Sequence, residues 1–168
     1  IEILSILNSQ EISHRDRVEK LSSLISIDFA YRVAIKSLFQ LDTNRAWELI
    51  NMDKINEIID ILWLLPSSNL NLDIISSNST LKSIYIAKGV IAIDGEIPIA
   101  DIFSIDTINF AKRGGAIELD ISFTYSCSVC KQHSPISFER CPKCYSIDSL
   151  KIKDTISKRE LYSGFSIF

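Results

Sequence analysis

Four cysteines gather in one short stretch, which reads YSCSVCKQHSPISFERCPKCYSI over residues 125–147. They are Cys127, Cys130, Cys141 and Cys144, and the sequence has no other cysteine. Their spacing is C-x2-C, then ten residues, then C-P-x-C. Each C-x2-C turn, or knuckle, directs two sulfurs to one point, so two facing knuckles offer four thiolates to a tetrahedral ion. The spacing therefore predicts a metal site with these four cysteines as ligands.

The metal that this ligand set favours is zinc, because four sulfurs fill a tetrahedral shell and leave no position open. Iron in a rubredoxin-type site uses the same ligands and is the alternative metal. Two disulfides are the alternative without metal, but they need an oxidising compartment and gain little from such local pairs. His133 lies between the two pairs, and we expect it at the surface because the four sulfurs already complete the shell.

Extended segments are expected around the knuckles. Alternating residues predict a strand over 117–126, and shorter strand-like segments lie at 136–138 and 147–152. This layout is typical of a zinc ribbon or rubredoxin-like module, which has little core and depends on its metal for folding. Many knuckles carry glycine after the second cysteine, where φ is positive. Lys131 and Tyr145 occupy those places here, so we expect strained or differently turned knuckles.

The first two-thirds of the chain shows apolar residues at helical spacing. Helices are predicted at 12–25, 29–41, 45–52, 54–65, 70–76, 81–93 and 98–112, with Ser13, Asp28, Asn44, Asp53 and Thr80 as N-caps and Pro98 in the first turn of the last helix. A row of short helices is typical of stacked helical hairpins. Within residues 84–103, Gly95 and Ala100 match two signature positions of a tetratricopeptide repeat, whereas Lys88 stands where the repeat usually has glycine. The alternative to a tetratricopeptide-like array is an unrelated helical bundle.

Apolar stripes on the first two predicted helices indicate where the core lies. The stripes are Val18, Leu21, Leu24 and Ile25 on one helix, and Phe29, Val33, Ile35, Leu38 and Phe39 on the other. Trp47 and Trp63 stand among Leu and Ile on later helices. We expect both tryptophans in the core rather than on a ligand-binding surface.

These elements predict a mainly α fold class, with a tetratricopeptide-like array of helical hairpins followed by a small β zinc-ribbon or rubredoxin-like module. The expected domains are helical hairpins over 1–115, the ribbon over 116–153 and a tail over 154–168. A helical turn is an option for 157–161. The tail also carries the apolar residues Phe165, Ile167 and Phe168. We expect them either to pack onto the helices or to serve as a docking peptide for a partner.

Charge is distributed unevenly. Residues 1–121 carry 11 Lys+Arg and 17 Asp+Glu, which gives a net charge of −6. Residues 122–153 carry 5 Lys+Arg and 2 Asp+Glu, which gives a net charge of +3. The basic residues of the ribbon, with Tyr145 as a stacking group, would suit nucleic acid; they are Lys131, Arg140, Lys143, Lys151 and Lys153. The acidic body would repel phosphate, and a solvated surface is the simpler interpretation of so few charges.

No apolar run approaches the ~20 residues that a membrane-spanning helix needs. The longest runs are IIDILWLL and IYIAKGVIAI. The chain begins at Ile1 rather than methionine, and IEILSILN already has helical spacing. We therefore expect a fragment of a longer protein, in which an upstream membrane anchor is an option.

The sequence does not indicate an enzyme. A glycine-rich phosphate loop is absent, because RGG at 113–115 is too short and follows a predicted helix. The histidines are His14 and His133, and they form no constellation with serine and aspartate. A closed shell of four sulfurs leaves no position for a catalytic water.

The pattern Y-x-C-x2-C, ten residues, C-P-x-C resembles the C-terminal rubredoxin-like domain of the lipopolysaccharide assembly protein B family. Tyr125, the four cysteines and Pro142 match that pattern, and the resemblance covers residues 125–151. Glu139 and Ile147 stand where the family usually carries tryptophan.

The resemblance implies a non-enzymatic adaptor at the cytoplasmic face of the inner membrane. In that family, a tetratricopeptide array precedes the metal domain and the protein helps a membrane protease to control an enzyme of lipid A synthesis. The partners so implied are proteins, namely a membrane protease or a lipid-synthesis enzyme, and only the four cysteines carry over residue by residue. A nucleic-acid-binding zinc ribbon, and a ribbon that merely caps a longer helical array, are the alternative functions.

Overall fold

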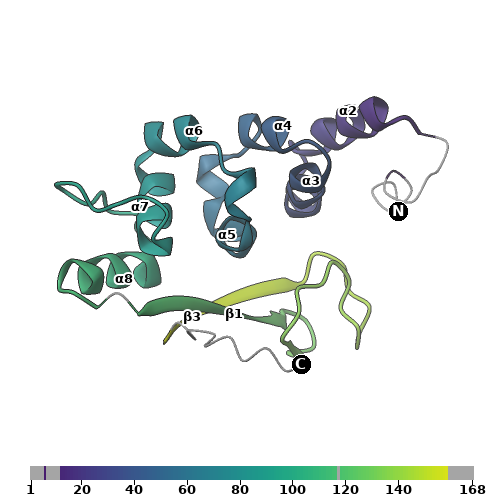
Figure 1. Ribbon diagram of the computed structural model, residues 1–168. Helices are drawn as coiled ribbons and strands as arrows, with labels where there is room; N and C mark the ends of the chain where they lie inside the picture. Colours follow the sequence, from purple (N-terminus) through teal and green to yellow (C-terminus); the bar gives the residue numbers. More distant parts are fainter. Residues whose placement is uncertain (1–5, 7–11, 117, 159–168) are drawn as a thin grey trace, which may run out of the picture.

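The structure of the chain is a computed structural model that describes residue 6, residues 12–116 and residues 118–158. In these residues a row of short helices precedes an antiparallel sheet, and the sheet lies along one side of the row (Figure 1). The helices are α2 His14–Leu24, α3 Asp28–Leu41, α4 Thr43–Glu48, α5 Ile55–Leu64, α6 Leu72–Ser77, α7 Ser79–Lys88 and α8 Phe103–Arg113, with 3-10 turns η1 Met52–Lys54 and η2 Ser67–Asn69. The expected fold class, mainly α with a small β module at its end, is confirmed.

The sheet has the strand order β2-β1-β3 and is antiparallel throughout. Its strands are β1 Leu119–Cys127, β2 His133–Ser134 and β3 Leu150–Lys158, with β1 and β3 paired from Leu119 opposite Lys158 to Cys127 opposite Leu150. The predicted strand at 117–126 is confirmed as β1. Strand β3 starts later than the predicted 147–152 segment and continues five residues into the part assigned to the tail.

The strand expected at 136–138 is wrong. The Ser134 hydroxyl accepts a hydrogen bond from the Ile136 N–H at 3.1 Å and donates to the Ile136 carbonyl at 2.6 Å. A side chain that bonds the neighbouring backbone in this way offers an alternative to strand pairing, and Pro135 lies between the two residues. Of the turn suggested at 157–161, Ser157 and Lys158 belong to β3; residues 159–161 and the apolar tail residues lie outside the described residues.

Helix caps are formed by polar residues, often upstream of the ones expected. Ser13 caps α2 as predicted, accepting from the Asp16 N–H. Asp42, Asn51 and Asn78 accept N–H groups at the starts of α4, η1 and α7. The expected caps that instead lie inside a helix or turn are Asp28, Asn44, Asp53 and Thr80. Each polar cluster at α4, η1 and α7 contains more than one eligible cap, and the one furthest upstream has the extended backbone that a cap requires.

The predicted hairpin between 81–93 and 98–112 has different bounds. Helix α7 ends at Lys88 because Gly89 adopts a left-handed conformation with φ of 84°, a common helix terminator. Helix α8 begins only at Phe103. Gly95 therefore lies between the two helices, as expected, whereas Pro98 and Ala100 lie in this connection instead of on a helix, so the segment 84–103 keeps only part of the tetratricopeptide layout.

The hydrophobic core runs through the row of helices and includes Ile121 of β1. Trp47 and Trp63 are buried, as expected, and the Trp47 indole N–H donates to the Asn69 carbonyl at 2.8 Å. The stripe predicted for α3 was wrong at Phe29, which is 57% exposed at the start of the helix. The buried residues of α3 are Ala30, Tyr31, Ala34, Ile35, Ser37, Leu38 and Phe39.

One face of the sheet packs on the helices and the other is polar. Ile121 belongs to the core, and Phe123 and Ile156 pack against it. Ser122 and Thr124, which alternate with these residues on β1, are exposed. Alternation of this kind is expected for an antiparallel sheet with one solvated face.

A buried polar network joins the helices to the sheet. The Arg32 guanidinium of α3 pairs with both oxygens of Asp60 on α5, each at 2.7 Å. The Tyr125 hydroxyl of β1 donates to Asp60 Oδ2 at 2.9 Å, and Arg32 also donates to the Ser137 hydroxyl at 3.0 Å. We call Arg32, Asp60, Tyr125 and Ser137 the Asp60 junction. It fixes the ribbon against two helices that lie far from it in sequence.

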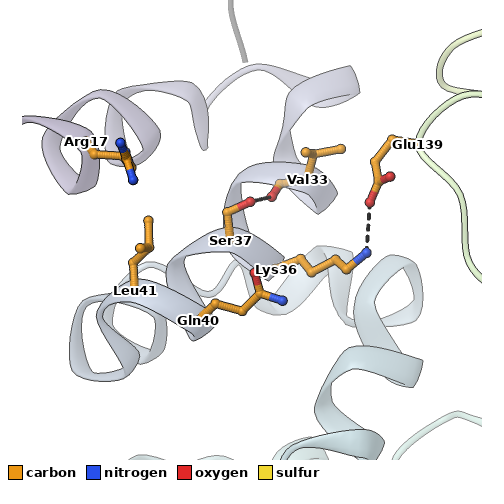
Figure 2. Close-up of a pocket in the computed structure, with 7 residues that line it drawn as sticks. All are labelled: Arg17, Val33, Lys36, Ser37, Gln40, Leu41 and Glu139. Carbon is orange, nitrogen blue, oxygen red and sulfur yellow. Dashed lines mark hydrogen bonds and ion pairs between the residues drawn. The ribbon is translucent and has the colours of Figure 1, made fainter. Parts of the chain in front are cut away.

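Two further contacts flank the junction. The Trp63 indole N–H donates to Asp120 Oδ1 at 3.0 Å, and Lys36 pairs with Glu139 at 2.8 Å. The Lys36–Glu139 pair stands at the edge of an open cavity of about 380 Å³ between α2, α3 and the ribbon, with Arg17 on its α2 side (Figure 2). The cysteine-bearing end of the sheet thus lies beside the first helices of the row.

Replacement of Asp60 should be strongly destabilising. Asp60→Ala leaves the partly buried Arg32 guanidinium and the buried Tyr125 hydroxyl without their shared acceptor. Breaking a buried ion pair costs about 3–5 kcal/mol, and we expect a loss toward the lower end of that range. Urea denaturation should show this loss in the free energy of unfolding. The matched control is Glu48→Ala, which removes the exposed Arg45–Glu48 pair and should change it by less than about 1 kcal/mol. Equal effects of the two substitutions would contradict the importance of the Asp60 junction.

Candidate metal centre

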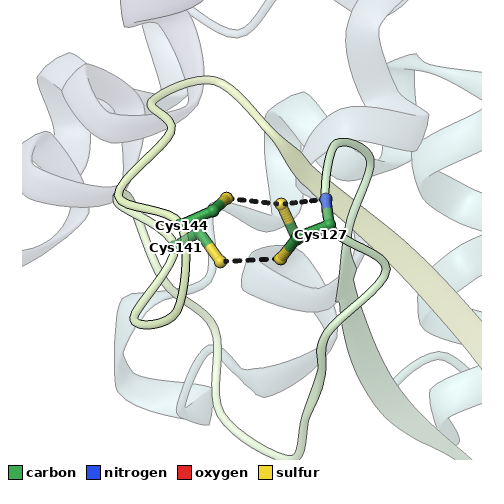
Figure 3. Close-up of side chains that lie close together, drawn as sticks. Cys127, Cys141 and Cys144 are labelled. Carbon is green, nitrogen blue, oxygen red and sulfur yellow. Dashed lines mark hydrogen bonds between the residues drawn. The ribbon is translucent and has the colours of Figure 1, made fainter.

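The four predicted cysteines converge at one end of the sheet (Figure 3). Cys127 Sγ lies 3.6 Å from Cys144 Sγ, and Cys130 Sγ lies 3.6 Å from Cys141 Sγ. All four sulfurs lie within 4.8 Å of one another. Tetrahedral ligands at the zinc–sulfur distance of about 2.3 Å stand roughly 3.8 Å apart, so this spacing fits one ion. The thiols are free rather than paired in disulfides.

The two knuckles have the same backbone hydrogen bonds. In the first, the Lys131 N–H donates to the Cys127 carbonyl at 3.0 Å and the Cys127 N–H donates to the Gln132 carbonyl at 2.9 Å. In the second, the Tyr145 N–H donates to the Cys141 carbonyl and the Cys141 N–H to the Ser146 carbonyl, both at 2.9 Å. The turns are therefore equivalent, and each presents its two sulfurs to the other.

Lys131 and Tyr145 each adopt φ of 60°. They take the left-handed conformation that glycine usually supplies after the second cysteine, which costs a residue with a side chain roughly 1–2 kcal/mol. The expectation of strained knuckles is thus confirmed, whereas a differently built turn is not observed. The backbone bonds of the knuckles hold both residues in this conformation.

The surroundings of Cys127 and Cys130 shift the pKa values of these two thiols in opposite directions. Burial raises the pKa of Cys127, but bonds from Ser146, Ser149 and two backbone N–H groups outweigh it and lower the pKa to about 5. A bond from Gln132 lowers the pKa of Cys130, but burial and the other three cysteines outweigh it and raise the pKa to about 11. Four adjacent thiols cannot all ionise without a cation among them, so a bound metal ion is the state that permits four thiolates.

Two serines at this site were not found by the sequence analysis. The Ser146 hydroxyl lies 3.0 Å from Cys144 Sγ, 3.4 Å from Cys127 Sγ and 3.0 Å from the hydroxyl of Ser149, which is buried. The sequence signal that could have indicated them is their position, two and five residues after the last cysteine. His133 is exposed on β2, as expected, and outside the group of described residues that could hold a metal ion.

Residues that carried the family resemblance have structural roles here. Tyr125 belongs to the Asp60 junction, which explains a buried tyrosine two residues before the first cysteine. Burial and the Asp60 charge raise the pKa of its hydroxyl, which therefore stays protonated and donates. Of the two positions that depart from the family, Glu139 pairs with Lys36 and Ile147 is exposed.

The basic residues of the ribbon are exposed, and two of them, Arg140 and Lys131, also contact the ribbon itself. The Arg140 guanidinium lies over the Tyr145 ring, 5.4 Å from its centre, and donates to the Tyr145 carbonyl at 3.0 Å. Lys131 donates to the Ser128 carbonyl. Lys151 and Lys153 are exposed on the polar face of β3. Tyr145 is thus already in contact with a cation, on the side that Arg140 covers.

The fold and the site define a helical chain that ends in an antiparallel sheet with a four-cysteine centre. No protein-family model, curated protein or solved structure matches the chain. In the parts of the chain that the structure describes, no helix has the length and apolar character needed to cross a membrane. The four-cysteine centre is able to hold a metal ion, and its geometry does not select the metal.

Glycine at the left-handed knuckle position should not weaken metal binding. Lys131→Gly removes strain of roughly 1–2 kcal/mol and adds unfolded-state entropy of about 0.5–1 kcal/mol, so metal affinity should rise slightly or stay unchanged. Lys143→Gly is the matched control, because Lys143 is a knuckle residue without positive φ and only the entropic loss applies. Titration with Co²⁺, followed by sulfur-to-metal absorption, compares them. Equal weakening by both substitutions would contradict the strain argument.

Proposed function

We propose that the protein is a non-enzymatic protein-interaction scaffold in which the four cysteines bind a structural zinc ion. The observation that carries the proposal is that all four sulfurs face one another, so an ion there would have every ligand supplied by the chain. A closed shell of this kind holds a fold together and offers no position for substrate or water. Zinc suits four thiolates in a tetrahedron and needs no redox partner, whereas iron would serve electron transfer.

The scaffold role is supported by how the ribbon is attached. The Asp60 junction and the shared core place the knuckles alongside α3 and α5, so metal binding would fix one relative orientation of ribbon and helices. A surface composed of both parts would then be available to a partner only in the metal-bound protein. Stacked helical repeats bind partners along extended concave surfaces, which a fixed ribbon would extend.

The resemblance of residues 125–151 to the lipopolysaccharide assembly protein B family supports the adaptor role. On that basis the proposed partners are proteins, specifically a membrane protease or a lipid-synthesis enzyme, and the proposed location is the cytoplasmic face of the inner membrane. The departure of the 84–103 segment from a tetratricopeptide hairpin means that no helical partner-binding residue is inferred from the family.

Nucleic-acid binding is the second candidate, favoured by the exposed Lys151 and Lys153 beside the knuckles. Against it stand the net charge of −6 over residues 1–121 and the contact of Arg140 with Tyr145. A ribbon that only caps a longer array is the third candidate. In that case the knuckles would contact no partner, and the partner-binding surface would lie on the helices alone.

The protein should contain one zinc ion per chain, and its partners should depend on that ion. Cys141→Ser removes a ligand, so metal content measured by mass spectrometry of the purified protein should fall. His133→Ala is the matched control and should keep the metal, because His133 lies outside the shell. Loss of metal in both variants, or iron in place of zinc, would contradict the proposed site.

The same pair of variants tests the function by affinity purification from native cells. Enrichment of a membrane protease or lipid-synthesis enzyme with the native protein and His133→Ala, but not with Cys141→Ser, is the expected result. Nucleic acid or ribosomal proteins that salt removes would support the second candidate instead. Partners that are retained by all three proteins would support the third candidate and contradict a role for the ribbon in binding.

A further inference from the structure

Helix α8 carries an apolar ridge on the side that faces away from the core. Phe103 is 84% exposed, the highest value among the large hydrophobic residues that the structure describes, and Phe110 is 65% exposed. Ile99, just before the helix, is 64% exposed and lines a small cleft together with Phe110 and Arg113. Single exposed apolar residues are ordinary, but three in one patch indicate a binding surface.

Helical geometry aligns these side chains. Phe103 and Phe110 are seven residues apart, which places them on one side of α8 and roughly 10 Å apart along its axis. Thr107 lies between them on the same side. The opposite side of the helix is buried and carries Ser104, Ile105, Ile108 and Asn109. We call Ile99, Phe103, Thr107 and Phe110 the α8 ridge.

The ridge can be buried without leaving a polar side chain unsatisfied. The one hydroxyl on it belongs to Thr107 and already donates to the Phe103 carbonyl at 2.6 Å. Thr107 is also small, so it forms a low point between two large rings. Thr107 of a second copy can approach closely at that point, and burial of an unpaired polar group, which would oppose association, is avoided.

Charge at the two ends of the ridge favours one particular occupant. Asp101 lies just before α8 and Arg113 is its last residue, whereas Asp106 and Lys112 are engaged within the chain, with the Ala100 N–H and the Ala87 carbonyl. Asp101 and Arg113 are both exposed. An antiparallel copy of the same helix would place the acidic end beside the basic end twice, and it would also oppose the helix dipoles favourably.

We propose that the α8 ridge is the surface through which two copies of this chain pair, with α8 antiparallel to α8 of the second copy and the two-fold axis at Thr107. Phe103 of each copy then packs beside Phe110 of the other, because the two rings are placed almost symmetrically about Thr107. This pairing follows from the ridge itself and does not depend on the identity of the metal or of any other partner.

The size of the ridge sets the expected strength of the pair. A buried aromatic side chain contributes about 150–250 Å², so the rings and Ile99 of two copies supply roughly half of a standard interface. Interfaces below standard size are typically weak and reversible. We therefore expect a monomer–dimer equilibrium with a dissociation constant on the order of micromolar.

Sedimentation velocity at concentrations on the order of 0.1–100 µM, which bracket that constant, tests the pairing. Phe110→Ser should weaken self-association at least tenfold. Phe29→Ser is the matched control, since Phe29 is also an exposed helical phenylalanine but lies on α3. A native chain that stays monomeric throughout this range, or equal effects of the two substitutions, would overturn the proposal.

Charge variants test the antiparallel orientation. Arg113→Glu should weaken the pair several-fold because it places a carboxylate, instead of a guanidinium, beside Asp101 of the second copy, and added salt should reduce the difference. Arg15→Glu makes the same charge change on α2 and should have no effect. A second outcome would also overturn the proposal. The chain would be monomeric, and amide hydrogen exchange in α8 would become faster when residues 159–168 are deleted. That result would mean that the tail, instead of a second copy, covers the α8 ridge.

Discussion

Asp60 is a carboxylate that is only 2% exposed, and the arrangement of the whole chain depends on how it is satisfied. Its oxygens accept hydrogen bonds from Arg32 on α3 and from Tyr125 on β1, so three elements that are distant in sequence meet at one side chain. A charge at this depth is tolerated only when it is paired and fully hydrogen-bonded. The helices and the sheet must therefore be in place together, and neither can shift without leaving a buried charge unpaired.

The cysteine centre extends this constraint to the end of the sheet. Tyr125 and Cys127 lie on the same face of β1, one side chain directed to the helices and the other to the knuckles. Ser137 and Glu139 of the segment between the knuckles contact Arg32 and Lys36. An ion held by the four sulfurs would fix both knuckles, and through these contacts it would stabilise the position of α3 and α5.

The sequence predicted the parts of the molecule that depend on local patterns. Cysteine spacing predicted the four-sulfur centre, and alternation predicted β1, because both signals lie within a few neighbouring residues. The end of α7 was missed because an apolar run continues past Gly89, whose left-handed conformation ends the helix. The Asp60 junction could not be predicted, since Arg32, Asp60 and Ser137 resemble ordinary surface residues until the fold brings them together.

The central claim is that ribbon and helices unfold as one unit when metal is bound. Equilibrium unfolding of the Co²⁺-loaded protein in urea measures this directly with two probes, tryptophan fluorescence from Trp47 and Trp63 in the helices and thiolate-to-cobalt absorption at the four cysteines. The account predicts that both signals change in a single transition with the same midpoint. Loss of the cobalt signal at a clearly lower urea concentration, with tryptophan fluorescence still native, would contradict it.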